Sequence, residues 1–449
     1  MKHLFSRLSP AQKIILSFLL VIFCGSLLLS LPWVQTASSQ AGYLDHLFTA
    51  VSMVCVTGLF TRSVVDTYNV WGQLLCMLLI QIGGLGILTF IGFFTMESRK
   101  KLSLKDRRIL RDSFSYGHNR TLGQFVRSIF ITTFSIEGLG ALLLMIRFIP
   151  KFGLRKGIFN SIFLAVSAFC NAGFDNFGND SLLGLQTDVL VNITLALLII
   201  TGGLGFMVWF DLATKLGGKQ KGLHFHTKVV LLLTAGLLVF GTVTSLWTEY
   251  NNPGTIGNLS FGDKLLVSFF QTVSMRTAGF SSIDYTAARP VTLFIYLLQM
   301  FLGGAPGGTA GGLKITTFLV LLLFARKEIL DLPHTNMGRR TLSPQLVQKA
   351  FGVTVIFQLT FLLGLLALGL VTDSSHRFIY LIFETVSALA TVGVTANITT
   401  SLNTAGMIVI MLLMFIGRVG PLTLMVSLNH YQPKNAATLH YSKADIMIG

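Results

Sequence analysis

The chain has 449 residues, of which 52% are hydrophobic and only 12% are charged, whereas roughly a quarter of the residues in an ordinary soluble domain are charged. This composition excludes a water-soluble globular protein and indicates a chain that is solvated by lipid. The net charge of +16 arises from Lys and Arg in short loops between apolar stretches, so it does not indicate a nucleic-acid-binding domain.

Eight apolar stretches reach, or nearly reach, the roughly 20 residues that a helix needs to cross a bilayer. In chain order they are Ile14–Trp33, Trp71–Met96, Phe125–Ile149, Val189–Ala213, Val229–Trp247, Val291–Phe324, Ala350–Val371 and Ala405–Leu428. Lys and Arg concentrate at both termini and in the loops after the second, fourth and sixth stretches, as they do in cytoplasmic loops. The sequence therefore predicts a multi-pass plasma-membrane protein with both termini cytoplasmic.

Between the two stretches of each successive pair lies a shorter, mildly apolar segment. These segments are Tyr43–Val54, Gly157–Phe169, Asp263–Met275 and Arg377–Ala390. Each is too short to span and suits a helix that enters the membrane and ends midway. Non-helical backbone at that depth is tolerated only where it is buried in protein or lines a water-filled cavity.

The four short segments resemble one another and each leads to a glycine. They read FTAVSMVCVTG, FLAVSAFCNAG, FQTVSMRTAG and FETVSALATVG, and they end at Gly58, Gly173, Gly279 and Gly393. Recurrence at near-regular intervals indicates internal duplication. We expect an all-α polytopic membrane protein of four tandem helix–pore helix–filter loop–helix repeats with pseudo-fourfold symmetry. The expected repeats cover residues 1–97, 98–214, 215–328 and 329–449.

The glycine loops are suited to binding a dehydrated cation. Backbone carbonyls that point to a shared axis replace the ion's hydration shell, and glycine reaches the dihedral angles that this needs. The C-terminal ends of four half-helices add partial negative charge. A single such loop would be interpreted as a packing turn, but four copies predict a K⁺ filter. Its ion-binding residues would be Val56, Thr57, Gly58, Asn171, Ala172, Gly173, Thr277, Ala278, Gly279, Thr391, Val392 and Gly393.

A glycine-rich run, Gly303–Gly312, interrupts the sixth stretch. Each Gly costs a helix roughly 1 kcal/mol and Pro306 roughly 3 kcal/mol, so the helix should break there. Leu313 stands where a phosphate-binding loop has its Lys, which excludes that motif. We call this run the glycine-rich loop and expect it to obstruct the pore as a gate; a passive kink is the alternative. The gating residues would be Gly303, Gly304, Gly307, Gly308, Gly311, Gly312 and Lys314.

Arg418 lies within the last apolar stretch. An arginine at that depth costs at least about 2.5–3.5 kcal/mol, so it should face the interior and bond to carbonyls or an acid. We expect it to contact the glycine-rich loop, repel cations and tune the gate, with a purely structural tie as the alternative. Glu384, in the fourth short segment, is interpreted as a buried acid paired locally.

Taken together, these motifs resemble the potassium-translocating membrane subunit of the Trk/Ktr/HKT superfamily, closest to the Ktr type. The most specific marks beside the four glycine loops are Gln81–Gly86, Thr201–Gly205, Gly303–Gly312 and Gly417–Pro421. The resemblance implies K⁺ selectivity when all four loop glycines are present, a gating loop in the third repeat and an arginine in the fourth that contacts it. It also implies a homodimer in the lipid bilayer and a cytosolic ring of regulatory subunits that bind nucleotide (ATP/ADP).

Two other functions compete with potassium uptake. A sodium-selective or sodium-coupled carrier on the same scaffold would be suggested by a serine at the first loop glycine, as in related plant proteins, and Gly58 argues against it. A membrane-embedded enzyme would need a nucleophile, a base or a metal cluster at membrane depth. His224 and His226 lie instead in a basic loop. The sequence predicts a transporter of K⁺ without a covalent cofactor, leaves open Na⁺ as a stimulating ion, and does not predict an enzyme.

Overall fold

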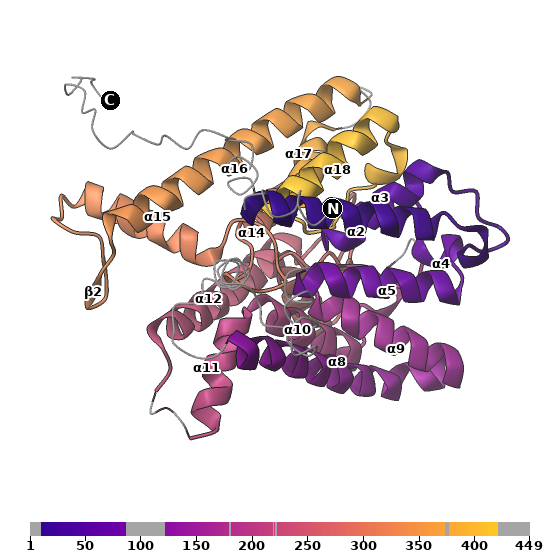
Figure 1. The fold of residues 1–449 in the computed structure, drawn as a ribbon, viewed down its shortest axis with the longest axis horizontal. Helices are drawn as coiled ribbons and strands as arrows, with labels where there is room; N and C mark the ends of the chain where they lie inside the picture. The colour runs from indigo at the N-terminus through magenta and orange to yellow at the C-terminus, as the bar shows by residue number, and fades with distance from the viewer. Residues whose placement is uncertain are drawn as a thin grey trace, which may run out of the picture.

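The computed structural model describes residues 10–86, 122–178, 181–218, 220, 222–372 and 377–420. Within these ranges the protein is a bundle of helices with one small β-hairpin at its edge (Figure 1). The hairpin pairs β1 (Asn336–Met337) with β2 (Arg340–Thr341) in antiparallel register. The architecture expected from the sequence, mostly helical and apolar, is confirmed at this level.

Four long helices carry the outer, apolar surface of the bundle. They are α2 (Pro10–Leu29), α8 (Leu122–Phe152), α12 (Phe225–Glu249) and α16 (Pro344–Val371), and by length and composition each could cross a membrane. They expose large apolar side chains, such as Phe23 (58%), Ile146 (64%), Leu232 (76%) and Leu370 (78%). Such surfaces are unfavourable in water and match the solvent properties of lipid.

Four shorter apolar helices follow the glycine loops. They are α5 (Val70–Leu85), α10 (Val189–Gly203), α14 (Pro290–Phe301) and α18 (Thr404–Val419). Side-chain caps set where three of them begin: Asn69, Asp188 and Asn403 accept backbone N–H groups of the first turn. With 12–16 residues, each is shorter than the roughly 20 residues of a full crossing.

The prediction of one continuous helix over Val189–Ala213 is wrong. The chain forms α10 and then α11 (Phe206–Leu216), and the two helices meet at an angle of 98°. The cause is Gly205, whose φ of +89° is left-handed and cannot continue a helix. The described residues thus contain four helices of spanning length, or five spans if this bent pair counts as one.

The four short segments between the paired stretches are helices close to their predicted bounds. They are α3 (Tyr43–Val54), α9 (Leu154–Phe169), α13 (Phe261–Ser274) and α17 (Phe378–Leu389). Their repeated phenylalanines, Phe48, Phe163, Phe270 and Phe383, are at most 1% exposed and belong to the main hydrophobic core. The core therefore holds the C-terminal ends of these helices, and with them the loops that follow.

Short elements complete the described chain. They are α4 (Val64–Thr67), α15 (Ile315–Ile329) and the 3-10 turns η1 (Pro32–Val34), η2 (Leu183–Leu185) and η3 (Thr399–Ser401). The predicted break in the sixth stretch is present, because α14 ends at Phe301 and α15 begins only at Ile315. The predicted continuations to Met96 and Leu428 lie outside the described residues.

Candidate ion filter and gate

The four loop glycines meet one another. Each has a left-handed φ, from +71° at Gly173 to +103° at Gly58. A Cβ built on any of them would lie within 3 Å of the carbonyl oxygen that precedes the glycine of another loop. The pairs are Gly58 with Ala172, Gly173 with Ala278, Gly279 with Val392, and Gly393 with Thr57. The loops therefore close into a ring in chain order, from the first to the fourth and back to the first.

The carbonyl groups of this ring are free to face an ion. Within the part of the chain that the structure describes, no hydrogen bond reaches the carbonyl oxygen of a predicted filter residue. Each loop also follows directly on the C-terminal end of α3, α9, α13 or α17, where a helix carries about half a negative charge. Both effects favour a monovalent cation that has lost its water.

The residue two positions before each glycine is left-handed as well. These residues, which we call the rim residues, have φ between +51° and +69° and are Val56, Asn171, Thr277 and Thr391. The three that are β-branched are strained in this conformation. Strain of this kind persists only where surrounding contacts hold it, and it concentrates at functional sites.

The serine of the repeated Val-Ser pair holds each loop in place. Ser52 and Ser387 accept hydrogen bonds at 3.1 Å from the backbone N–H groups of Gly58 and Gly393, respectively. Ser167 accepts one at 2.9 Å from the N–H of Phe174, just after the second glycine. In the third loop, which is one residue shorter, Ser274 instead donates to the carbonyl of Phe280 at 2.6 Å. The recurrence of Val-Ser signals a shared role, but the sequence alone does not assign it.

Glycines in the helices after the filter permit close packing against it. A Cβ on Gly83, Gly202 or Gly417 would lie within 3 Å of the last carbonyls of α3, α9 or α17. Each of these glycines opens a four-residue run that ends in a left-handed glycine, at residues 86, 205 and 420. The second position of the run is Gly84 in the first predicted repeat and Gly203 in the second, but Arg418 in the fourth. Arg418 thus replaces a glycine at an equivalent site.

The glycine-rich loop is closed at its base and bonded to the junction of α10 and α11. The N–H of Gly303 donates to Leu313 O at 2.9 Å, which joins the two ends of the loop. Ala305 N donates to Gly203 O at 3.0 Å, and Phe206 N donates to Gly307 O at 3.0 Å. The left-handed bend at Gly205 therefore creates the surface on which the loop rests.

Gly311 brings the loop against the filter. A Cβ on Gly311 would lie within 3 Å of both Thr391 Oγ1 and Ala390 O, which belong to the fourth filter loop. The other loop glycines contact different partners: Gly303 and Gly312 pack against each other, and Gly308 faces Gly202 and Gly205. Only part of the glycine-rich loop thus reaches the filter.

Two cationic side chains hold consecutive carbonyls of the loop. Arg418 donates to Thr309 O, to Gly83 O, and at 3.2 Å to Gly84 O. Lys314 donates to Ala310 O at 2.7 Å, with Gly311 O at 3.5 Å. Arg418 therefore bonds to backbone carbonyls from the first and third predicted repeats, and the two positive charges lie on the loop that touches the filter.

One side chain of α17 and one of α13 form hydrogen bonds with the segments that follow the fourth and third filter loops. Glu384 in α17 is fully buried and accepts hydrogen bonds from Thr395, at 2.6 Å, and Thr399. At the equivalent position in α13, Gln271 bonds to Ser282 at 2.7 Å and Tyr285 at 2.6 Å. Glu384 is thus a locally bonded side chain behind the filter.

Replacing Glu384 with alanine should lower the free energy of unfolding by about 2–3 kcal/mol, because the buried hydroxyl of Thr399 and the half-buried hydroxyl of Thr395 lose their acceptor. Thermal unfolding in lipid nanodiscs measures this change. Glu384→Gln keeps one acceptor oxygen and should lose less than half as much. Glu328→Ala, at an exposed position of α15, is the control and should unfold like the wild type. Equal stability of the Glu384→Ala and wild-type proteins would contradict the bracing role.

The structure brings the predicted site residues together in one place. All twelve predicted filter residues lie in the ring or directly before it, and Lys314 and Arg418 donate hydrogen bonds to carbonyls of the adjoining glycine-rich loop. That the ring binds K⁺ and that the loop gates it remain predictions. Residues that the prediction lacked are the four serines and Thr309, a loop side chain that bonds to α9.

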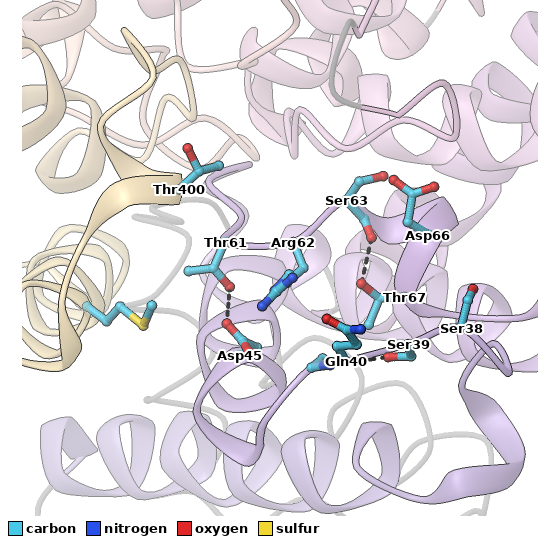
Figure 2. A pocket seen from close by; sticks show the side chains of 12 residues that line it. Ser38, Ser39, Gln40, Asp45, Thr61, Arg62, Ser63, Asp66, Thr67 and Thr400 are labelled. Atoms are coloured by element: carbon cyan, nitrogen blue, oxygen red, sulfur yellow. Dashed lines mark hydrogen bonds between the residues drawn. The ribbon is translucent and has the colours of Figure 1, made fainter.

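A separate polar pocket of about 570 Å³ lies beside the first repeat. Figure 2 shows hydroxyl, amide and carboxylate side chains around it, with Thr61 donating to Asp45 at 2.7 Å. The wall comes from the loop before α3, the segment after the first filter loop, and Thr400 with Met407 from the last repeat. None of the predicted filter or gate residues is among the described residues that line it.

Known proteins are similar to this chain in sequence and in fold. A family model described as "TrkH: Cation transport protein" matches residues 7–438. Ktr system potassium uptake protein B of Bacillus subtilis is 38% identical over 446 residues, which cover 99% of this chain and 97% of that protein. Potassium/sodium uptake protein NtpJ of Enterococcus hirae is 38% identical over 453 residues, which cover 100% of this chain and 99% of that protein.

A solved structure has a similar fold. The crystal structure of the potassium transporter TrkH from Vibrio parahaemolyticus superimposes with a TM-score of 0.73 and covers 93% of this chain and 84% of that one. At 17% identity this likeness concerns the fold alone. These relatives are named as ion transporters and not as enzymes. Because the family model and the full-length relatives span nearly the whole chain, this protein belongs to the TrkH family of cation transport proteins.

Proposed function

We propose that this protein takes up potassium ions across the plasma membrane through a filter of backbone carbonyls. The observation that carries the proposal is the closed ring of four loops, in which each left-handed glycine faces a carbonyl oxygen of the next loop. Carbonyls that accept no hydrogen bond from the described residues, at the ends of four short helices, offer a cation the oxygens that it loses from water. The names of two full-length relatives, both uptake proteins for potassium, support the choice of ion.

A sodium-selective or sodium-coupled transporter on the same scaffold is the second candidate. The name of NtpJ, a potassium/sodium uptake protein, favours it specifically. Na⁺ could then serve as a stimulating ion beside K⁺. Glycine at all four ring positions favours K⁺ as the ion that the filter selects, because a side chain at any of them would enter the ring.

The glycine-rich loop is proposed as the gate of this pore. It rests against the fourth filter loop through Gly311, and Arg418 and Lys314 hold three consecutive carbonyls of it. Two positive charges beside a cation pathway raise the electrostatic barrier to permeation. We assign the predicted gating residues, from Gly303 to Lys314 together with Arg418, to this function.

The membrane arrangement and assembly follow from the same proposal. Four repeats, covering 1–97, 98–214, 215–328 and 329–449, would cross the membrane eight times with both termini cytoplasmic. The helices after the filter, α5, α10, α14 and α18, would complete their crossings with residues that follow them; for α10 and α14 these are the bent helix α11 and the glycine-rich loop with α15. We further propose a homodimer controlled by a cytosolic nucleotide-binding ring. The term "Ktr system" in a relative's name implies more than one component and supports a partner subunit.

Complementation of a bacterium that lacks its own potassium uptake tests the proposed function. The full chain, expressed with the nucleotide-binding subunit of a Ktr system, should restore growth on low potassium. Gly58→Ser should reduce the ratio of K⁺ to Na⁺ uptake, because its side chain would reach the carbonyl of Ala172. Gly138→Ser, at a glycine of α8 with open space around it, is the matched control and should behave like the wild type. No growth with correctly inserted wild-type protein would overturn potassium uptake.

A further inference from the structure

Two rim residues form hydrogen bonds with the glycine-rich loop. The hydroxyl of Thr309 lies 3.1 Å from Phe169 O and 3.1 Å from the side-chain amide of Asn171. With its amide nitrogen turned toward α10, Asn171 donates to this hydroxyl and also to Ile199 O at 3.3 Å. On the next filter loop, the hydroxyl of Thr277 accepts the N–H of Gly311 at 3.2 Å. The loop is therefore bonded to the second and third filter loops.

The side chains of the other two rim residues, Thr391 and Val56, form no hydrogen bond with the described residues of the glycine-rich loop. Thr391 is fully buried, and its hydroxyl has no hydrogen-bond partner among the described residues. Gly311 covers this hydroxyl, as the short approach of a Cβ built there indicates. A buried hydroxyl without a partner is unfavourable. Val56, in the first loop, has an apolar side chain and packs on Gly83.

We propose that the rim residues form the seat of the gate, in which Asn171 and Thr277 latch the glycine-rich loop closed and Thr391 opposes closure. This inference rests on the proposed gate and deepens it, because it assigns the latch to the filter loops themselves. When the loop withdraws, Asn171 and Thr277 lose their partners on it, whereas the hydroxyl of Thr391 gains access to water. The balance between closed and open states is then set by side chains two residues from the filter glycines.

Substitutions of threonine by the isosteric valine test the proposal, because they should change the open-to-closed ratio of the gate in opposite directions at different positions. Thr309→Val and Thr277→Val each remove a latching hydrogen bond and should raise the open-to-closed ratio about fivefold, the effect of losing one neutral hydrogen bond. Thr391→Val removes the unpartnered hydroxyl, keeps the β-branched shape and should lower the ratio by a similar factor. Rb⁺ flux into proteoliposomes that contain the full chain measures the ratio. Hydrogen exchange of the amides at 303–312 measures release of the loop without reference to transport.

Three matched variants act as controls. Thr309→Ser keeps the hydroxyl and should return flux and exchange toward the wild-type values, and Thr277→Ser should return the exchange at 303–312. Thr360→Val removes a hydroxyl that bonds within α16, to Ile356 O at 2.8 Å, and should change neither. Thr309 lies outside the filter, so its variants remain informative if changes at Thr277 or Thr391 prevent folding.

The two readouts separate failure of the latch from failure of the proposed function. Absence of Rb⁺ flux in the wild-type protein would overturn the transport proposal, while the exchange measurement would still decide the latch. Faster exchange at 303–312 in Thr309→Val and Thr277→Val, with slower exchange in Thr391→Val, would support the proposed latch. Changes of the same sign in all three valine variants, or unaltered exchange in Thr309→Val, would overturn it.

Discussion

Replacing Gly393 with alanine should abolish potassium uptake, with a loss of flux of at least about a hundredfold. The φ of this residue is +97°, where a Cβ costs roughly 1–2 kcal/mol. The same Cβ would overlap the carbonyl oxygen of Thr57 in the first loop. The ring would then separate at one of its four junctions, and the carbonyls would lose their common centre. Flux of Rb⁺ into proteoliposomes measures the effect.

Gly369→Ala is the matched control for this substitution. Gly369 lies in α16, and a Cβ built on it meets no atom within 4 Å. Alanine should stabilise the helix there by up to about 1 kcal/mol and leave the flux unchanged. If the Gly393→Ala protein inserts normally and conducts as well as the Gly369→Ala protein, the ring of loops is not the ion pathway.

Arg418→Gln should raise the basal flux of K⁺ about tenfold or more when no regulatory subunit is present. Arg418 ties Thr309 O of the glycine-rich loop to Gly83 O and Gly84 O of α5, and glutamine is too short to bridge these groups. A hydrogen bond to a charged group contributes about 1.5–3 kcal/mol, so its loss should release the loop substantially. The substitution also removes a positive charge beside the cation pathway.

Arg418→Lys separates the two contributions of this side chain. Lysine keeps the charge but not the planar fork that bonds to several carbonyls at once, so its flux should lie between those of the wild type and Arg418→Gln. Arg326→Gln, at an exposed position of α15, is the control for loss of a cation elsewhere. Unchanged flux in a folded Arg418→Gln protein would remove Arg418 from the gate and leave it a structural tie.

The short helices and the broken sixth stretch could be predicted because local signals decide them. Tyr43–Val54 is too short to span, is apolar and precedes a glycine, and α3 has those bounds. The run Gly303–Gly312 disfavours helix whatever surrounds it, and α14 accordingly ends at Phe301. The family was recognisable because the chain resembles it in the four glycine loops taken together with the runs Gln81–Gly86, Thr201–Gly205, Gly303–Gly312 and Gly417–Pro421, and the family model and the full-length relatives confirm it.

Features that depend on contacts between distant segments could not be predicted in the same way. In the sequence Gly205 is one more glycine in an apolar stretch, yet in the structure its left-handed φ turns the chain by 98°, and the glycine-rich loop bonds to the backbone on both sides of this bend. The carbonyl partners of Arg418 come from Gly83, Gly84 and Thr309, which are remote in sequence. From an arginine in an apolar stretch one can predict that it needs hydrogen-bond acceptors, but not which residues supply them.

Arg418 stands where two other repeats have Gly84 and Gly203, and this has a consequence for how such a pore can be controlled. In a homotetramer of one-repeat subunits, the same substitution would place four arginines around the axis. Their mutual repulsion, and the cost of burying each of them, would disfavour assembly. The proposed fusion of four repeats into one chain would permit a single, off-axis charge that acts on one side of the proposed pathway. Under the proposed function, such a fusion would allow the gate and the ring of filter carbonyls to diverge independently.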